Sequence, residues 1–325
     1  MRSVFAAVAA TLVLGLLMAM VAPASAQQVY PHKPIRLIVP FPAGGSTDPL
    51  ARLVGQQLTE SWGQQVLVDN RPGGNTIIGT DAVAKSAPDG HTILLTATSH
   101  VTYPLLVTTP FDAIRDFAPV STLTSTELIL VLHPSVAAGN LQELISLAKS
   151  HPGQLNYASS GTGNPNQLAA ELFNMMAGIK LTHVPYKGGG PAIADLVGGQ
   201  VQAHFATPIA VISYLKAGKL KAIATTNDAR SPALPQVPTF AEAGLPGFEV
   251  KVWFGVLAPA GTPKEIIEKL STEFAKIMAM PDIKEKLERQ GMSPFVVAKE
   301  RFSALMKDDM AKYAKVIKIA NIKME

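Results

Sequence analysis

The residues best suited to chemistry in this sequence lie in two glycine-rich segments, and the chemistry they suit is anion binding. The first segment, 41–47, joins an apolar run at 35–39 to a stretch with helical spacing. The second, 159–164, joins another apolar run to a helical stretch that begins at Pro165. A glycine-rich turn that enters a helix exposes backbone N–H groups at the positive end of the helix dipole, where an anion is stabilised.

Each loop taken alone also fits an ordinary turn, because neither matches GxGxxG or a P-loop. Two such loops in two halves of one chain favour a single anion held at both ends. Asp48, followed by Pro49, has the pattern of a helix N-cap. His100 follows an apolar run at 92–96 and is a ligand contact, a proton donor or a surface histidine. Lys187, beside three glycines, is either an anion contact or part of a turn.

The sequence lacks the common signatures of catalysis. It has no cysteine, no H-x-x-x-H or H-E-x-x-H spacing among its 7 histidines, and no G-x-S-x-G elbow. The glycine loops expose backbone and carry few side chains for acid–base or nucleophilic chemistry. We therefore predict a binding protein that is not an enzyme and that needs no metal or cofactor.

Composition and the N-terminus indicate an exported, soluble protein. The 325 residues are enough for two domains, and the net charge of +4, without a basic run interleaved with aromatics, does not indicate nucleic-acid binding. Residues 1–26 combine Arg2, an apolar run at 5–21 and an A-x-A site ending at Ala26, which is the pattern of a secretory signal peptide. We expect a periplasmic monomer that is not inserted in the membrane after cleavage.

The order of apolar runs and helical stretches predicts the fold class. Strands are expected near 35–39, 65–68, 92–96, 128–132, 155–160, 182–186, 201–205, 220–224 and 250–257. Helical stretches alternate with most of them, which favours parallel sheets in an α/β fold. The segment 262–265 reads as a capping box that opens a further helix. Because the tail after Pro259 has too few strands for a domain, we expect one lobe from 27–125 plus 254–325 and another from 126–253.

A series of short motifs, in order along the mature chain, resembles one family. They are Tyr30-Pro31, Val39-Pro40-Phe41 with Gly44-Gly45, Asn70-Arg71-Pro72-Gly73, Ala87-Pro88-Asp89-Gly90, Tyr157-Ala158-Ser159, Val184-Pro185-Tyr186-Lys187-Gly188, Ala241-Glu242-Ala243-Gly244-Leu245-Pro246-Gly247 and Ala258-Pro259-Ala260-Gly261-Thr262-Pro263. With these motifs the chain resembles the Bug (TctC-like) solute-binding proteins of tripartite tricarboxylate transporters.

The resemblance implies a two-lobed "Venus flytrap", each lobe a Rossmann-like sheet flanked by helices. It also implies that the first glycine loop holds one ligand carboxylate and that main-chain donors of the second loop hold the other. The candidate ligand-binding residues combine the two glycine loops with residues that follow other predicted strands. They are Phe41, Ala43, Gly44, Gly45, Ser46, Thr47, Ser99, His100, Ser159, Ser160, Gly161, Thr162, Gly163, Asn164, Asn166 and Thr207.

The function implied is capture of a small organic carboxylate, a di- or tricarboxylate, for delivery to the membrane subunits of such a transporter. Two alternatives stay open: a ligand-sensing subunit of a membrane receptor, and an exported enzyme on the same scaffold. Departures from the family pattern, such as Gln167 where relatives commonly have histidine, leave the identity of the ligand open.

The A-x-A site yields a testable prediction about processing. We expect cleavage after Ala26, so that the mature chain begins at Gln27. Intact-mass spectrometry of the protein from the periplasmic fraction measures this directly. A mass that retains residues 1–26 would contradict the prediction.

Overall fold

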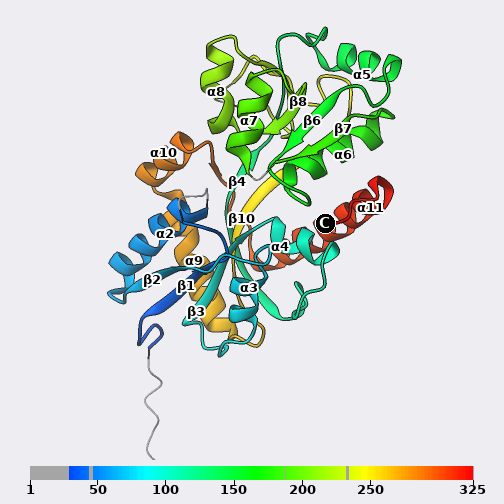
Figure 1. The fold of residues 1–325 in the computed structure, drawn as a ribbon. Helices are drawn as coiled ribbons and strands as arrows, with labels where there is room; N and C mark the ends of the chain where they lie inside the picture. The colour runs from blue at the N-terminus through cyan, green and yellow to red at the C-terminus, as the bar shows by residue number, and fades with distance from the viewer. Residues whose placement is uncertain (1–28, 44–46, 187, 232–233, 325) are drawn as a thin grey trace, which may run out of the picture. The chain divides into compact units, whose positions relative to one another are not determined.

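The computed structural model describes residues 29–43, 47–186, 188–231 and 234–324. Contacts divide the chain into two compact units, Met1–His32 and Lys33–Glu325, and the elements below all belong to the second. This unit contains two β-sheets with helices around them (Figure 1). In the described ranges, no helix has the length and apolar character needed to cross a membrane.

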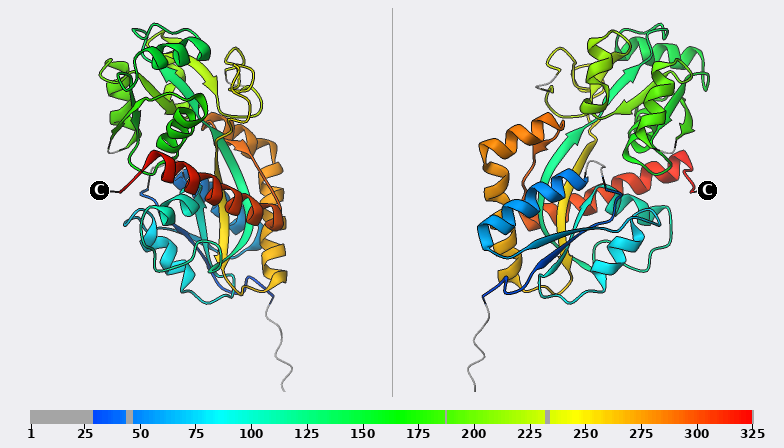
Figure 2. Two further views of the ribbon diagram at one scale, coloured as in Figure 1. Left: turned by 90° about the vertical axis from the view of Figure 1, so that its right-hand side faces the viewer. Right: turned by 60° about the vertical axis from the view of Figure 1, so that its left-hand side comes forward.

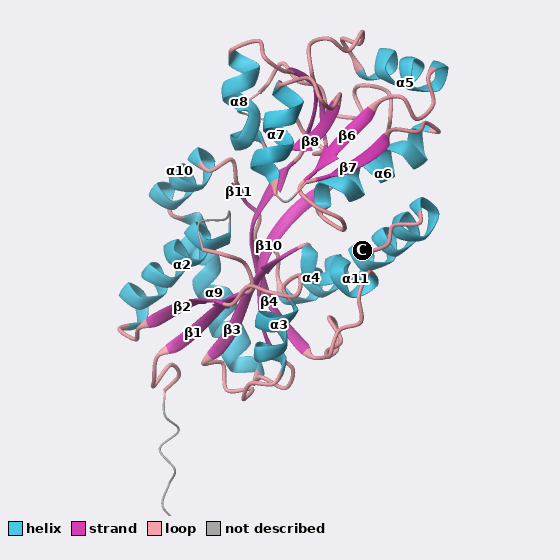
Figure 3. Ribbon diagram, viewed as in Figure 1, coloured by secondary structure: helices cyan, strands magenta, loops and turns pink. Residues whose placement is uncertain are grey.

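The first sheet has six strands in the order β11-β4-β10-β3-β1-β2. Its strands β1, β2 and β3 are parallel to one another, whereas β10 runs antiparallel to both β3 and β4. Figure 3 shows β4 and β10 side by side, although more than a third of the chain separates them in sequence. The strand bounds are β1 (Ile35–Val39), β2 (Val66–Asn70), β3 (Thr92–Ala97), β4 (Phe117–Glu127), β10 (Lys251–Pro259) and β11 (Ser293–Pro294).

Helices cover both faces of this sheet, and successive side chains along each strand point to opposite faces. Ile38 packs in one cluster with residues of α3 (Ile77–Ala84) and α11 (Lys299–Ala320). Its neighbour Leu37 points to the opposite face because successive strand residues alternate. Leu37 pairs in register with Val68, against which α2 (Thr47–Trp62) packs closely at Gly55. Helix α2 also contacts α9 (Lys264–Ala279), so the first sheet is the middle layer of three.

The second sheet has five strands in the order β7-β6-β8-β5-β9. Every residue of β5 is buried, with Leu130 and Leu132 in a core shared with α5 and α6, and Ile129 and Val131 in a core shared with α7 and α8. A strand buried on both faces has a continuously apolar sequence, as β5 does. The bounds are β5 (Ile129–Leu132), α5 (Leu141–Ser150), β6 (Asn156–Ser159), α6 (Pro165–Ala177), β7 (Thr182–Pro185), α7 (Gly189–Val197), β8 (Ala203–Ala206), α8 (Pro208–Lys216) and β9 (Lys221–Thr225).

The chain passes between the two sheets at two adjacent segments. Leu128 alone separates β4 from β5, and its N–H donates to the hydroxyl of Thr226 at 3.0 Å. The same hydroxyl donates to the carbonyl of Val250, just before β10, at 2.6 Å. The buried Thr226 thus hydrogen-bonds to both segments at which the chain passes between the sheets. The strand order supports the predicted division into lobes, which we retain as a proposal. Helix α11 contacts both α4 (Ser99–Thr102) and α6. Both views in Figure 2 show α11, in red, below the green helices around the second sheet.

The α/β prediction with two sheets is confirmed, but several local predictions are wrong. Helix α2 begins at Thr47, so Asp48 lies in its first turn instead of at the N-cap, and it pairs with Arg52 at 3.1 Å. The predicted capping box at 262–265 does not form: α9 begins at Lys264, so its N-cap is Pro263, which has no side-chain oxygen. The Thr262 hydroxyl donates to the carbonyl of Pro259 at 2.8 Å.

Strand β4 was not predicted, because its sequence is rich in Ser and Thr. These hydroxyls are nevertheless buried and paired: Thr122 donates to the carbonyl of Phe295, and Thr126 donates to that of Gly291 at 2.8 Å. The partners come from the segment after α10 (Pro281–Arg289), more than 160 positions along the chain. No local sequence pattern reveals such a partner.

His100 is a core residue in this structure. It is 2% exposed, its ring lies 4.8 Å from that of Phe117, and its Nε2–H donates to the carbonyl of Ala113 at 2.9 Å. Burial lowers the pKa of His100 to about 4, since the apolar surroundings disfavour the charged ring. The expectation of a surface histidine is therefore wrong, and His100 is not among the described residues that line the cavity reported below.

Burial of His100 predicts a loss of stability in acid. Between pH 6.5 and 4 the unfolded chain binds a proton at this histidine that the folded chain excludes. The free energy of unfolding should therefore fall as the pH falls, by up to about 1.4 kcal/mol per pH unit from this residue. His100→Gln retains an N–H donor for Ala113 and should reduce the slope measured by urea titration. An unchanged slope in the variant would contradict the assignment.

Asp309 predicts a second stability effect, at the contact of α11 with β10. Its carboxylate accepts from the indole N–H of Trp253 at 2.9 Å and pairs with Lys312 at 2.8 Å, and both Trp253 and Asp309 are buried. Asp309→Ala leaves the indole N–H without a partner, so urea unfolding should show a loss of about 2 kcal/mol. The matched control is Asp308→Ala at an exposed position, expected to change stability by less than about 0.5 kcal/mol. Equal effects of the two variants would show that the buried contact contributes little.

Candidate functional site

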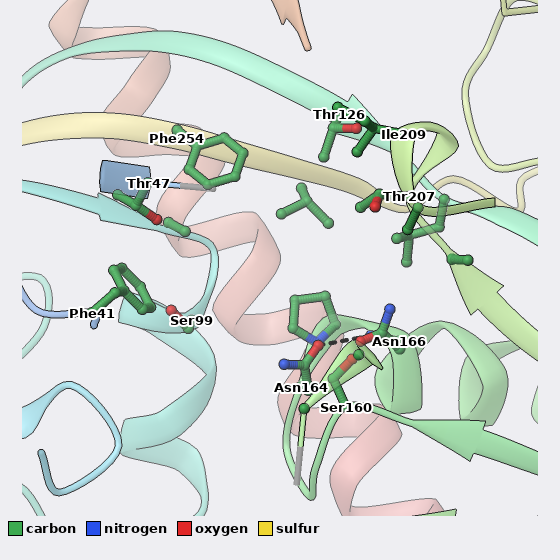
Figure 4. Close-up of a pocket in the computed structure, with 18 of the residues that line it drawn as sticks. Phe41, Thr47, Ser99, Thr126, Ser160, Asn164, Asn166, Thr207, Ile209 and Phe254 are labelled. Carbon is green, nitrogen blue, oxygen red and sulfur yellow. Dashed lines mark hydrogen bonds between the residues drawn. The ribbon is translucent and has the colours of Figure 1, made fainter. Parts of the chain in front are cut away.

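A cavity of about 520 Å³ lies where the parallel strands of both sheets end (Figure 4). The first sheet contributes residues that follow β1 and β3, including Phe41, Thr47 and Ser99. The second contributes residues that follow β6 and β8, including Asn164 and Thr207. The carboxyl ends of strands are the usual ligand-binding edge of α/β sheets.

Four helices of nine residues or more begin at this cavity. Helix α2 begins at Thr47, α6 follows the N-cap Asn164, α7 follows Gly188 and α8 follows Thr207, and all four of these residues line the cavity. Each helix start directs its positive dipole end and unpaired N–H groups toward the same space. None of the described lining residues is Asp, Glu, Lys or Arg. The electrostatic character of the described wall is therefore set by neutral groups, and it favours an anion.

Polar side chains in the cavity supply further neutral groups. The Oγ of Ser99 is buried and makes no hydrogen bond within the described part of the chain. Asn166 is fixed in orientation because its Nδ2 donates to the carbonyl of Phe205 at 2.6 Å. In Figure 4 the side chains of Ser160, Asn164 and Asn166 lie close together on one side of the cavity, whereas Ser99 lies beside Phe41 on the other.

His204 is a cavity-lining residue that the sequence analysis did not select. Its Nδ1–H donates to the carbonyl of Ala158 at 2.8 Å, and burial lowers its pKa to about 4. At neutral pH the ring is therefore uncharged, with Nε2 as a hydrogen-bond acceptor. His204 lies within β8. Because ligands bind at the carboxyl ends of strands in α/β sheets, its place in a predicted strand could have pointed to the cavity.

The rest of the wall is largely apolar. Leu128 and Ile193 line it from the second sheet and its helices, and Phe254 and Met292 line it from β10 and the segment before β11. Phe254 and Met292 were missed because they reach the cavity only through the return of the chain to the first sheet. These surfaces are suited to the hydrocarbon part of a ligand, since burial of apolar area is favourable.

Seven of the sequence-predicted residues line the cavity, and six do not. Those that line it are Phe41, Thr47, Ser99, Ser160, Asn164, Asn166 and Thr207. Gly44, Gly45 and Ser46 lie outside the described residues, as does Lys187. The six described residues absent from the lining are Ala43, His100, Ser159, Gly161, Thr162 and Gly163.

The glycines of the second loop do not line the cavity, and there is a specific physical reason. The N–H of Gly163 donates to the Oε1 of Gln167 at 2.7 Å, and the N–H of Gly161 donates to the Oγ of Ser159 at 3.2 Å. These two donors hold the loop itself and are not free for a carboxylate. Gly163 has φ +77°, a conformation that favours glycine, and a Cβ there would lie 2.4 Å from Leu106 Cδ1, so that side chain would have to shift. The expectation that these two N–H groups bind the ligand is withdrawn.

Comparison with known proteins identifies the family. Residues 50–322 match the family described as "Tripartite tricarboxylate transporter family receptor" (TctC). The chain is 38% identical to Protein BugT of Bordetella pertussis over 94% of each chain.

Two solved structures are similar over most of the chain. Rpa4515 of R. palustris, solved with adipate, is 35% identical with a TM-score of 0.78, over 90% of this chain and 99% of that one. MatC from Rhodopseudomonas palustris, solved with bound malate, is 31% identical with a TM-score of 0.73, over 89% and 100%. With its two-sheet fold and its cavity at the strand ends, the chain belongs to the TctC (Bug) family of periplasmic solute-binding proteins, which are receptors and not enzymes.

Proposed function

We propose that this protein captures a small di- or tricarboxylate in the periplasm and delivers it to the membrane subunits of a tripartite tricarboxylate transporter. The observation that carries the proposal is the set of four helix starts around a cavity whose described lining has no ionic side chain. The export signal predicted in residues 1–26 supports the periplasmic location.

Hydrogen bonds to a charged group favour a carboxylate at each end of the ligand. Each such bond contributes roughly 1.5–3 kcal/mol, so two or three per carboxylate offset a large part of the cost of removing it from water. The candidate donors are the hydroxyls of Thr47 and Ser99 on one side, and those of Ser160 and Thr207 on the other, with the N–H groups of the helix starts. Donors from both sheets suit a ligand with two separated carboxylates.

The same lining disfavours amino acids as ligands. An α-ammonium group needs a carboxylate or several carbonyl acceptors, and the described lining contains no Asp or Glu. The apolar side chains of Leu128, Ile193 and Phe254 instead suit an unsubstituted carbon chain. The ligands seen in relatives, adipate and malate, are both dicarboxylates without an ammonium group.

A set of ligands of matched length tests the proposal. We expect isothermal titration of the mature protein to show binding of adipate or a related dicarboxylate. Adipamide, which is neutral, should bind at least tenfold more weakly, since it loses the charge-assisted bonds to the helix starts. Hexane-1,6-diamine, a dication of the same chain length, should not bind. Aspartate should bind more weakly than malate, which differs from it by a hydroxyl in place of the ammonium.

The outcomes separate the electrostatic argument from simple shape complementarity. If adipamide bound as tightly as adipate, the helix starts would not be the source of affinity. If the diamine bound and the diacids did not, the proposed ligand class would be wrong. Conversion of any of these compounds during incubation would support the exported-enzyme alternative instead.

A further inference from the structure

A hydrogen-bonded network centred on His183 holds the interior of the second glycine loop. The Nε2 of His183 in β7 lies 2.6 Å from the Oγ of Ser159, at the end of β6. Its Nδ1 lies 3.1 Å from the Nε2 of Gln167 in α6. Ser159 and Gln167 in turn bond to Gly161 and Gly163 of the loop. One ring therefore links both ends of the loop.

Donor and acceptor roles in this network follow from the backbone N–H of Gly163. The Gly163 N–H can only donate, so the Gln167 atom that faces it must be Oε1. The other amide atom, Nε2, then donates to Nδ1 of His183, which must carry no hydrogen. The hydrogen of a neutral ring is therefore on Nε2 and is donated to Ser159 Oγ, whose own hydrogen is donated to the carbonyl of Gly161 at 3.1 Å.

The surroundings of His183 keep its ring neutral. The ring stacks on that of Tyr157 with centroids 5.0 Å apart, and the Tyr157 hydroxyl donates to the carboxylate of Glu171. Burial lowers the pKa of His183 to about 4. A proton on Nδ1 would face the amide N–H of Gln167, which also donates, so the network is consistent only with the neutral Nε2–H tautomer.

The loop held in this way carries two cavity residues. Ser160 and Asn164 flank the glycine segment and both line the cavity. Asn164 is also the N-cap of α6, with its side chain accepting from the N–H of Asn166 at 3.3 Å. A change in the conformation of Gly161 or Gly163 would therefore displace the side chains that the second sheet offers to a ligand.

We infer that His183 and Gln167 are positioning residues for ligand capture: they fix the second glycine loop so that Ser160 and Asn164 face the ligand, without touching it themselves. The effect on affinity rests on the proposed carboxylate-binding function. The effect on the loop does not, and it is measurable in the ligand-free protein.

The first experiment uses nitrogen NMR of the ligand-free mature protein at pH 7. We expect His183 to show the Nε2–H tautomer and the Gly163 amide to exchange slowly with solvent. Gln167→Met removes both amide bonds while keeping similar bulk, and should increase the exchange rate of Gly163. Gln167→Glu keeps the acceptor for Gly163 and places a carboxylate oxygen at Nδ1. It should therefore retain slow exchange and convert His183 to the imidazolium form, a signature that a packing role alone would not produce.

The second experiment measures adipate affinity by isothermal titration. Gln167→Met should weaken binding by about tenfold, because loss of the loop geometry removes the equivalent of one hydrogen bond to a charged group. His183→Gln, which retains a donor near the position of Nε2, should weaken it less than His183→Leu. The matched control is His151→Asn at an exposed position after α5, which should bind as the parent protein does.

Three results would overturn the inference: an Nδ1–H tautomer of His183 in the parent protein, unchanged Gly163 exchange in Gln167→Met, or unchanged adipate affinity in that variant with faster exchange. If the parent protein binds no dicarboxylate, the proposed function fails, while the tautomer and exchange measurements still decide the role of His183 in the loop. Circular dichroism and melting of each variant identify any that do not fold, and Gln167→Glu then serves as the folded comparison.

Discussion

The proposed function places one electrostatic constraint on the structure: an anionic ligand is to be stabilised by a cavity wall whose described residues include no cationic side chain. Backbone dipoles meet that constraint, because α2, α6, α7 and α8 all begin at the cavity. Such dipoles act only when the strands that precede the helices end at the same place. The order of strands in both sheets, and the paired crossings at Leu128 and Thr226, can be understood as the means of bringing those ends together.

Sequence patterns predicted what depends on local chemistry. Residues 128–132 were recognisable as a strand because burial on both faces requires uninterrupted apolar residues, and the second glycine loop was recognisable because Gly161 and Gly163 adopt positive φ angles that favour glycine. Strand β4 was not, since its buried hydroxyls are paired with carbonyls of residues 291 and 295. The apolar residues of the cavity, such as Phe254, were likewise out of reach because a strand from the end of the chain returns to the first sheet.

The residues of the site were predicted only in part, and the reason is more specific. Sequence reasoning treated every exposed donor of a glycine loop as available to the ligand, and so selected Gly161 and Gly163 with Ser160 and Asn164. The structure separates these into two groups, because the N–H groups of both glycines are committed to Ser159 and Gln167. The distinction rests on the position of Gln167, one turn into α6, and of His183 on the neighbouring strand, which a motif of six residues does not contain.

Different residues hold the second glycine loop and line the cavity beside it. A loop whose conformation is fixed by its own hydrogen bonds presents flanking side chains that can be substituted without loss of the loop geometry. In the proposed function Ser160 and Asn164 face the ligand, while Ser159, Gln167 and His183 hold the loop that carries them. Preorganisation of this kind also reduces the entropy lost when the ligand binds. Under the proposed function, the loop geometry serves to hold a carboxylate, and the shape of the apolar wall sets the length of the ligand that is accepted.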